Sequence, residues 1–292
     1  MPSFAVSISI LGLVQAALVA LPAPRRPPEW IERLSSPWWA LVPALSIAVV
    51  IGAIEISPGS ADALTYIALV AVPPLAVFAL GALIPRNRTG PQISRFRAVS
   101  AADGGSWWGP VVVVGGLFAL AWITPLSLAG EVAATALSGL ACVTLGWLLV
   151  CGVPAKWLRL GVYAMAVIDT VYVVSDLLQG PNAVLNAATP AAGLPRLQAV
   201  HFGSAVMGFG DLFVAALVGC LLAQPPADEP QSRDINRFQS RRQWIAAGLV
   251  AVLALAFDLL FFTVDELPST VPVAVALALV QWRRLRLAVP TR

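Results

Sequence analysis

Charged residues and histidine are scarce in this chain. Of its 292 residues, 11% are charged and one, His201, is a histidine, whereas 59% are apolar. A soluble domain has about 25% charged and about 45–50% apolar residues, and a globule of this size cannot hide so much apolar surface. The composition therefore excludes a soluble enzyme and a disordered chain, and the single histidine excludes a multi-histidine metal site.

Cysteine and lysine are also rare. The three cysteines, Cys142, Cys151 and Cys220, fall in or at the end of apolar stretches, without a paired framework or metal-ligand spacing. We therefore expect small buried apolar residues at these positions, and neither a disulfide scaffold nor a metal site. Lys156 is the one lysine against 17 arginines, a composition that points to a high-GC prokaryotic source.

Nine apolar stretches are candidates for membrane-spanning helices, because a bilayer core about 30 Å thick needs about 20 helical residues. They are residues 3–21, 38–56, 64–84, 110–126, 132–150, 160–178, 200–222, 244–264 and 267–282. We expect an all-α polytopic membrane protein with one transmembrane domain over residues 1–292. Its first six helices lie in about 3–178 and its last three in about 200–282.

The distribution of basic residues predicts the orientation in the membrane. Seventeen of the 18 Lys and Arg residues fall in loops on one side, and only Arg196 falls on the other. Because Lys and Arg accumulate in cytoplasmic loops, the N-terminus is expected outside and the C-terminus in the cytoplasm of a prokaryotic cell. The positive net charge therefore reflects topology and lipid headgroups, with no nucleic-acid partner. The one-sided loops are residues 22–37, 85–109, 151–159, the solvated connector 223–243 and the C-terminal tail.

Six acidic residues fall in or at the edge of these stretches, where an ionised carboxylate costs several kcal/mol. Three of them lie within about a turn of a predicted helix end and are expected to reach water: Glu55, Glu131 and Asp176. The other three, Asp169, Asp211 and Asp258, lie deeper and need a functional reason.

Two of the deep aspartates are expected at the same level. Asp169 lies nine residues into the sixth stretch, which starts on the cytoplasmic side, and Asp211 lies 11 residues into the seventh, which starts outside. These depths are about 14 and 16 Å at the rise of an α-helix. Antiparallel helices would bring both carboxylates near the midplane, with Asp258 nearer the outer face. The sequence therefore predicts a facing carboxylate pair.

The residues around these aspartates carry a resemblance to a known family. Gly208-Phe209-Gly210-Asp211 matches the GxGD motif of the presenilin and signal peptide peptidase family of intramembrane aspartyl proteases. The family's other catalytic aspartate follows a tyrosine on the preceding helix, where this chain has Ile168 before Asp169. The chain also resembles the family in its nine expected spans, with the aspartates on the sixth and seventh.

The resemblance implies a site and a reaction. Asp169 and Asp211 would be catalytic, residues 208–210 would form the active-site motif, and the family's Pro-Ala-Leu motif would correspond to Pro272-Val273-Ala274, which would position the substrate. Two carboxylates in low dielectric share one proton. The ionised one takes a proton from water, which attacks the scissile carbonyl, so no metal or cofactor is needed. The implied substrates are single-span membrane proteins or signal-peptide remnants, whose helix must unwind locally.

Three alternatives remain open. Midplane carboxylates also mark proton- or ion-coupled transporters, in which Asp258 would join the pair. A prepilin-peptidase-like enzyme shares the GxGD motif but typically continues with lysine, where this chain has Leu212. The departure at Ile168 is also compatible with an inactive family member that acts as a scaffold. The sequence carries no signal for an oligomeric state.

Overall fold

A computed structural model describes residues 3–23, 52, 57, 59–83, 108–175, 177, 179–224, 233–262 and 268–288. Nearly all of the second expected span, 38–56, lies outside the described residues. The same holds for Glu55, for Asp176 and for most of the arginine-rich loops 22–37 and 85–109.

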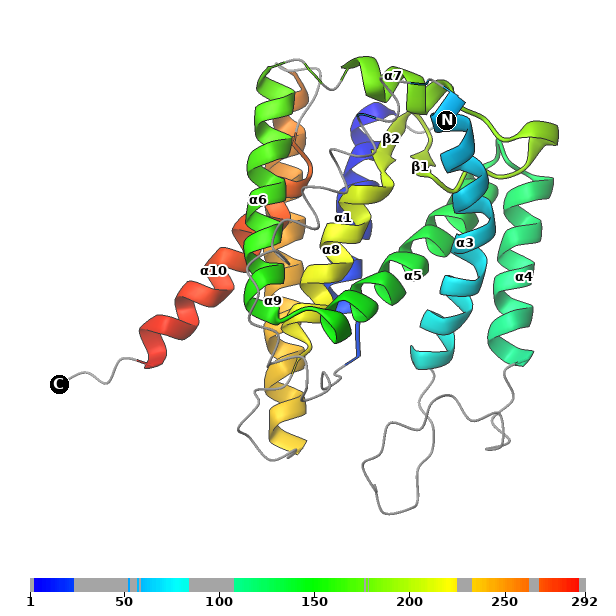
Figure 1. Cartoon of the computed structure of the whole chain (residues 1–292). Coiled ribbons are helices and arrows are strands. Elements are labelled where there is room, and N and C mark those ends of the chain that lie inside the picture. The colour runs from blue at the N-terminus through cyan, green and yellow to red at the C-terminus, as the bar shows by residue number, and fades with distance from the viewer. Residues whose placement is uncertain are drawn as a thin grey trace.

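Helices make up most of the described chain (Figure 1). They are α1 (Phe4–Ala20), α3 (Gly59–Leu83), α4 (Trp108–Ile123), α5 (Leu128–Gly152), α6 (Ala155–Val174), α7 (Gln179–Ala187), α8 (Phe209–Leu222), α9 (Arg233–Asp258) and α10 (Thr270–Ala288). Two 3₁₀ turns, η3 (Ala191–Gly193) and η4 (Leu259–Phe262), and two strands, β1 (Ala199–Phe202) and β2 (Ala205–Gly208), complete the described elements.

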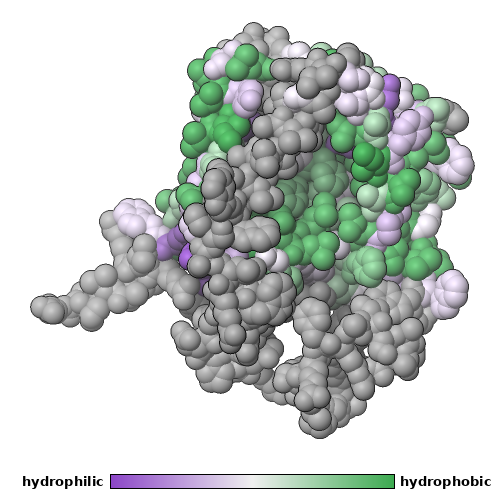
Figure 2. Space-filling model, viewed as in Figure 1, coloured by the Kyte–Doolittle hydropathy of each residue, from purple (hydrophilic) through white to green (hydrophobic). Residues whose placement is uncertain are grey.

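Several helices have the composition of membrane spans. Among the described residues, α3, α5 and α6 are long and apolar enough to cross a bilayer, and α1, α4 and α8 are shorter apolar helices. Large apolar side chains also cover the outside: Val70 on α3 is 74% exposed and Val112 on α4 is 67% exposed. Figure 2 shows apolar residues over much of one face. Lipid, rather than water, is the solvent in which such a surface is stable.

The described helices alternate in direction (Figure 1). α1, α3, α5, α8 and α10 run from the upper end of the view to the lower end, whereas α4, α6 and α9 run upwards. α8 lies at the centre and is buried over nearly its whole length, packed on α5 and α1. α1 also packs on α9, and α10 packs on α9, α6 and α8. This arrangement places the starts of α8 and α10 beside α6.

Helices α1, α8 and α9 pack closely together at the lower end. A Cβ atom at Gly219 of α8 would lie 2.7 Å from the carbonyl oxygens of both Leu18 and Val19 at the end of α1. The buried Gln243 of α9 donates from Nε2 to the carbonyl oxygens of Pro22 at 2.9 Å and of Gly219 at 3.3 Å. The absence of a side chain at Gly219 therefore allows the backbones of α1 and α8 to come into contact. The hydrogen bonds of Gln243 stabilise this contact.

The structure corrects two expected boundaries. Residues 200–208, expected in the seventh span, lie in the β1–β2 hairpin or its turn, and the helix starts at Phe209. Residues 233–243, expected in a solvated connector, belong to α9. The last helix runs to Ala288, beyond the apolar stretch itself. Hydropathy marks where a chain is apolar, whereas a helix continues for as long as its backbone hydrogen bonds do.

Candidate active site

The β1–β2 hairpin leads the chain into the site. Its strands pair antiparallel, with Val200 opposite Met207 and Phe202 opposite Ala205, and only Gly203 and Ser204 form the turn. Gly203 has a φ of 60°, in the left-handed region that glycine adopts without steric cost. Val200 and Met207 face the core at 1% and 6% exposure. The alternate residues, which include His201, form the more open face of the hairpin.

The turn of the hairpin is fastened to two helices. The Gly203 N–H donates to Oε2 of Glu131 in the first turn of α5 at 2.7 Å. The Ser204 N–H donates to Oγ of Ser7 on α1 at 3.4 Å. Glu131 is expected from the sequence to reach water at a helix end. In the structure it is half-buried, and its carboxylate holds the turn of the hairpin in place.

The β1–β2 hairpin leads directly into the helix that carries Asp211. β2 ends at Gly208, which is the N-cap of α8, and Asp211 lies in the first turn of that helix. α8 starts below the upper ends of α1 and α6 (Figure 1). The expected helical path of 11 residues before Asp211 is therefore wrong, because residues 199–208 form a hairpin whose pairing returns Gly208 to the level of Ala199.

One dipeptide holds both predicted aspartates. Thr270, the first residue of α10, donates to Oδ2 of Asp169 from its hydroxyl at 2.6 Å and from its N–H at 3.3 Å. The adjacent Ser269 donates from its hydroxyl to Asp211, as does the N–H of Gly208. The two carboxylates lie within electrostatic range of each other. The structure therefore brings Asp169 and Asp211 together, as the sequence predicts.

Helix ends contribute to the site. Asp169 accepts a bond from the first N–H of α10, and Asp211 lies in the first turn of α8. The N-terminus of a helix carries partial positive charge and unpaired N–H groups, which stabilise negative charge. Two helix N-termini therefore offset part of the cost of placing carboxylates in an apolar surrounding.

The two motif glycines leave space beside Asp211. Gly208 and Gly210 are exposed, and a Cβ atom at Gly210 would meet nothing within 4 Å. A Cβ atom at Gly208 would lie 3.2 Å from Oδ2 of Asp211, so a side chain there would crowd the carboxylate. Phe209, between the two glycines, is half-buried against the core, and its carbonyl accepts from Sγ of Cys142 at 3.9 Å.

The residues expected to position a substrate lie farther along α10. Val273 and Ala274 are buried in the core at 0% and 6% exposure, and Pro272 is also buried. The hydrogen bonds to the aspartates come from Ser269 and Thr270, which sequence reasoning did not single out. A signal was present, because Ser and Thr are preferred where a helix starts.

The remaining acids form no metal centre in the part of the chain that the structure describes. There, no group of three or more His, Cys, Asp or Glu side chains is arranged to hold a metal ion. Asp258, the third deep aspartate, accepts a hydrogen bond from the Ser9 hydroxyl of α1 at 3.2 Å.

His201 makes the hairpin sensitive to acid. Burial, aided by the nearby Arg196 guanidinium, lowers the pKa of His201 below its ordinary 6.5, while the Glu131 carboxylate acts in the opposite direction. Below that ordinary value the unfolded hairpin therefore binds more protons than the folded one, so stability rises with pH and is lost on acidification. We expect faster amide hydrogen exchange in residues 199–208 at about pH 5 than at about pH 7, after correction for intrinsic rates. His201→Gln should remove this difference, and a difference that persists would contradict the assignment.

Comparison of the chain with family models, with curated proteins and with solved structures gives no match. The chemistry of the site therefore rests on its own geometry. Two carboxylates lie together with four hydrogen-bond donors around them, two from side-chain hydroxyls and two from the backbone. Such a pair can share a proton and exchange it with water or a substrate.

Proposed function

We propose that the protein is an intramembrane aspartyl protease that hydrolyses peptide bonds within the transmembrane helices of its substrates, with Asp169 and Asp211 as the catalytic pair. The observation that carries the proposal is the Ser269-Thr270 dipeptide, which donates one hydroxyl to each carboxylate. Helices α6, α8 and α10 thus meet at one acidic site. The resemblance of residues 208–211 to the GxGD motif supports the same conclusion.

The reaction follows from the paired carboxylates. They hold one proton between them, because two negative charges this close in low dielectric repel strongly. The ionised carboxylate removes a proton from water, and the water oxygen bonds to the scissile carbonyl carbon. The protonated carboxyl group donates to the carbonyl oxygen. When the C–N bond breaks, the pair returns a proton to the leaving amine. The hydroxyls of Ser269 and Thr270 keep the two groups in position.

Ser269 and Thr270 also suggest a new position for the third family motif. They follow Pro268 at the start of the last helix. By its contacts, Pro268-Ser269-Thr270 occupies the place that the resemblance assigns to Pro-Ala-Leu, in preference to Pro272-Val273-Ala274. The positioning role thereby falls on residues that contact the catalytic pair directly.

An extended substrate fits the approach to the site. A peptide bond inside a regular membrane helix is shielded, so the substrate must unwind before cleavage. In the family that this chain resembles, the unwound substrate pairs with strand-like segments. β2 runs directly into the first turn of α8, and Val206 on its open face is 42% exposed. We assign the hairpin as the segment that receives the substrate.

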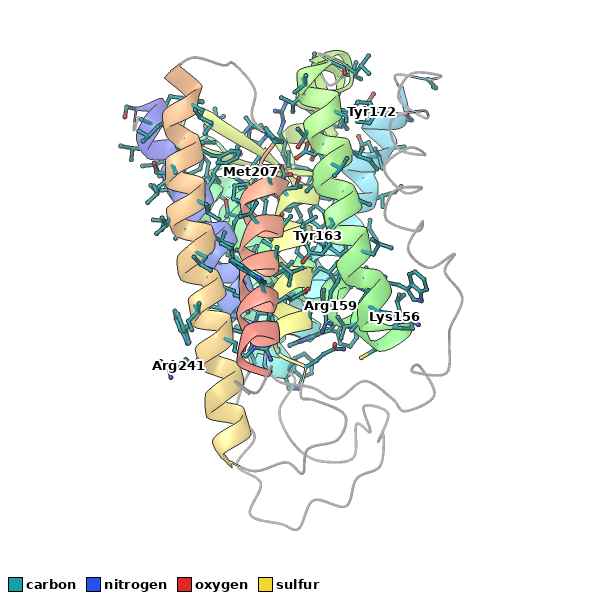
Figure 3. The ribbon with its side chains drawn as sticks, turned by 90° about the vertical axis from the view of Figure 1, so that its left-hand side faces the viewer. Lys156, Arg159, Tyr163, Tyr172, Met207 and Arg241 are labelled. Carbon is teal, nitrogen blue, oxygen red and sulfur yellow. The ribbon has the colours of Figure 1, made fainter. Side chains whose placement is uncertain are left out.

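The membrane topology is part of the proposal. Nine spans, with the N-terminus outside and the C-terminus in the cytoplasm, agree with the alternating helix directions and with the basic loops. Lys156, Arg159 and Arg241 lie toward one end of the molecule, the inferred cytoplasmic end (Figure 3). This orientation suits single-span substrates, including signal-peptide remnants, with cytoplasmic N-termini.

Cleavage of a defined helix tests the proposal. The full-length protein in detergent is incubated with a signal-peptide-like substrate, and the products are mapped by mass spectrometry beside the Asp169→Ala and Asp211→Ala proteins. Cuts within the substrate span that vanish in both variants are the expected result. The absence of such cuts with folded wild-type protein, or cuts that persist in both variants, would refute the proposed activity.

Thr270 offers a finer test of the same site. Thr270→Val removes the hydroxyl that donates to Asp169 at 2.6 Å but keeps the branched shape. A hydrogen bond to a charged group contributes about 1.5–3 kcal/mol, so kcat should fall about 10- to 100-fold if the bond positions Asp169 for the reaction, and Tm should fall by a few degrees. Thr270→Ser, which keeps the hydroxyl, is the control and should restore most of the rate. Equal rates for the valine and serine variants would contradict a positioning role.

A further inference from the structure

A small, partly open cavity lies between α1, β2, the upper part of α9 and the start of α10, and Ser269 forms part of its lining. Its volume is about 40 Å³. A buried water needs at least about 10–15 Å³ when volume is measured in this way, so the cavity has room for one or a few waters and for no larger ligand. Its lining includes Gln15, Met207, Asp258, Ser269 and Pro272.

Polar groups connect this cavity to the site. Gln15 of α1 is 1% exposed and donates from Nε2 to the backbone oxygen of Ser269 at 3.4 Å. The hydroxyl of Ser269 in turn donates to Asp211. A polar path therefore leads from the cavity to the catalytic pair through one residue.

The opposite wall of the cavity carries Asp258. Its carboxylate accepts from Ser9 at 3.2 Å, which fills one of about four acceptor positions and leaves others for water. Asp258 is the last residue of α9, whose end lies at the upper end of the molecule, whereas α10 starts lower (Figures 1 and 3). The cavity thus extends from the inferred outer end towards the depth of the catalytic pair.

We propose that this cavity is the water store of the enzyme, in which Asp258 and Gln15 hold water that passes by Ser269 to the Asp169–Asp211 pair. The proposal rests on the proposed protease function. Each peptide bond hydrolysed consumes one water, and the hydrocarbon around the helices supplies none. The cavity has sufficient room for bound water, and its mainly apolar lining offers Gln15, Asp258 and Ser269 as polar partners. It also explains why α1 buries Gln15 among apolar side chains.

Radiolytic footprinting detects the water directly. X-rays convert bound water into hydroxyl radicals that oxidise adjacent side chains, and methionine is especially reactive. Met207 lines the cavity, whereas Met165 on α6 does not line it, and both are 6% exposed. In the full-length protein in lipid nanodiscs, Met207 should oxidise several-fold faster than Met165. In ¹⁸O-labelled water the added oxygen should carry the label.

Variants of Asp258 test the supply of water. Asp258→Leu should lower the rate of Met207 oxidation to that of Met165 and lower kcat about tenfold, the effect of one lost hydrogen bond to the stored water. Asp258→Glu keeps a carboxylate and should retain most of both signals. Asp62→Asn removes an exposed carboxylate from the first turn of α3 and is the matched control, with both signals unchanged.

The outcomes separate this proposal from the protease proposal. Equal oxidation of Met207 and Met165 in the wild type would overturn the water store whatever the cleavage result. Fast Met207 oxidation with unchanged kcat in a folded Asp258→Leu protein would overturn its role in supply. Fast Met207 oxidation in a wild type that cleaves nothing would leave a hydrated cavity but refute both the protease and the supply role.

Discussion

Glutamate at position 169 or 211 is expected to inactivate the protein by about 10²-fold or more, as asparagine does. Asparagine removes the ionisable group, and general acid–base catalysis contributes about 10²–10⁴-fold to a rate. Glutamate keeps the charge but carries one more methylene, which displaces the carboxyl group by about 1 Å. A misplacement of about 1 Å costs about 10²-fold. The hydrogen bonds from Thr270 at 2.6 and 3.3 Å leave Asp169 little freedom to compensate.

Substrate cleavage by the four single variants, followed by mass spectrometry, measures this effect. Asp62→Asn serves as the control for loss of an acidic residue elsewhere. A proton-coupled transporter predicts a different pattern, because a relay tolerates a carboxylate on a longer side chain better than it tolerates an amide. Substantial activity in both glutamate variants, with none in the asparagine variants, would count against the catalytic pair and favour a relay.

Gly219→Ala is expected to destabilise the protein strongly. The new Cβ atom would lie 2.7 Å from two carbonyl oxygens at the end of α1 and 2.9 Å from Cγ of Pro22. Backbone atoms cannot rotate away as a side chain does, so α1 and α8 must separate. Overpacking typically costs about 1–3 kcal/mol, and a backbone obstacle places this variant at the upper end. The shift would also lengthen the hydrogen bonds from Gln243.

Thermal unfolding in detergent, followed by tryptophan fluorescence, measures the loss. A cost of about 3 kcal/mol lowers Tm by about 5 °C in a chain of this length. Gly248→Ala is the matched control, because a Cβ atom at this exposed position of α9 meets nothing within 4 Å. Alanine there should stabilise the helix by about 0.5–1 kcal/mol. Similar Tm values for the two variants would show that the α1–α8 contact is not tight.

The meeting of the two aspartates could be predicted from the sequence, although one premise was wrong. Depth counted along two antiparallel helices places Asp169 and Asp211 at one level. The structure brings them together, but Asp211 reaches its place through a hairpin. The agreement survives because the chain enters from the upper end in either case.

The hairpin was missed because a short apolar run fits a helix or a strand equally well by hydropathy. A local signal was nevertheless present. Gly203-Ser204 separates two runs in which Val200 and Phe202, and then Ala205 and Met207, alternate with the residues of the open face. A two-residue loop that begins with glycine is typical of a tight hairpin.

The roles of Ser269 and Thr270 could not be read from spacing. Thr270 lies 101 residues beyond Asp169, and only the packing of α10 on α6 brings them together. The correspondence of Pro272-Val273-Ala274 rests only on its likeness to the Pro-Ala-Leu motif of the family. Contacts across the fold depend on how helices pack, and the order of letters within one helix does not encode that.

The adjacency of Ser269 and Thr270 has a mechanical consequence. Their Cα atoms are about 3.8 Å apart, as in any trans peptide. This short, fixed link limits the distance between the two carboxylates that Ser269 and Thr270 contact on different helices. Thermal motion of α6 against α8 is therefore limited at the site itself. A displacement of the start of α10 moves the hydrogen-bond donors of both carboxylates at once. Asp169 and Asp211 would therefore lose their positions together rather than one at a time.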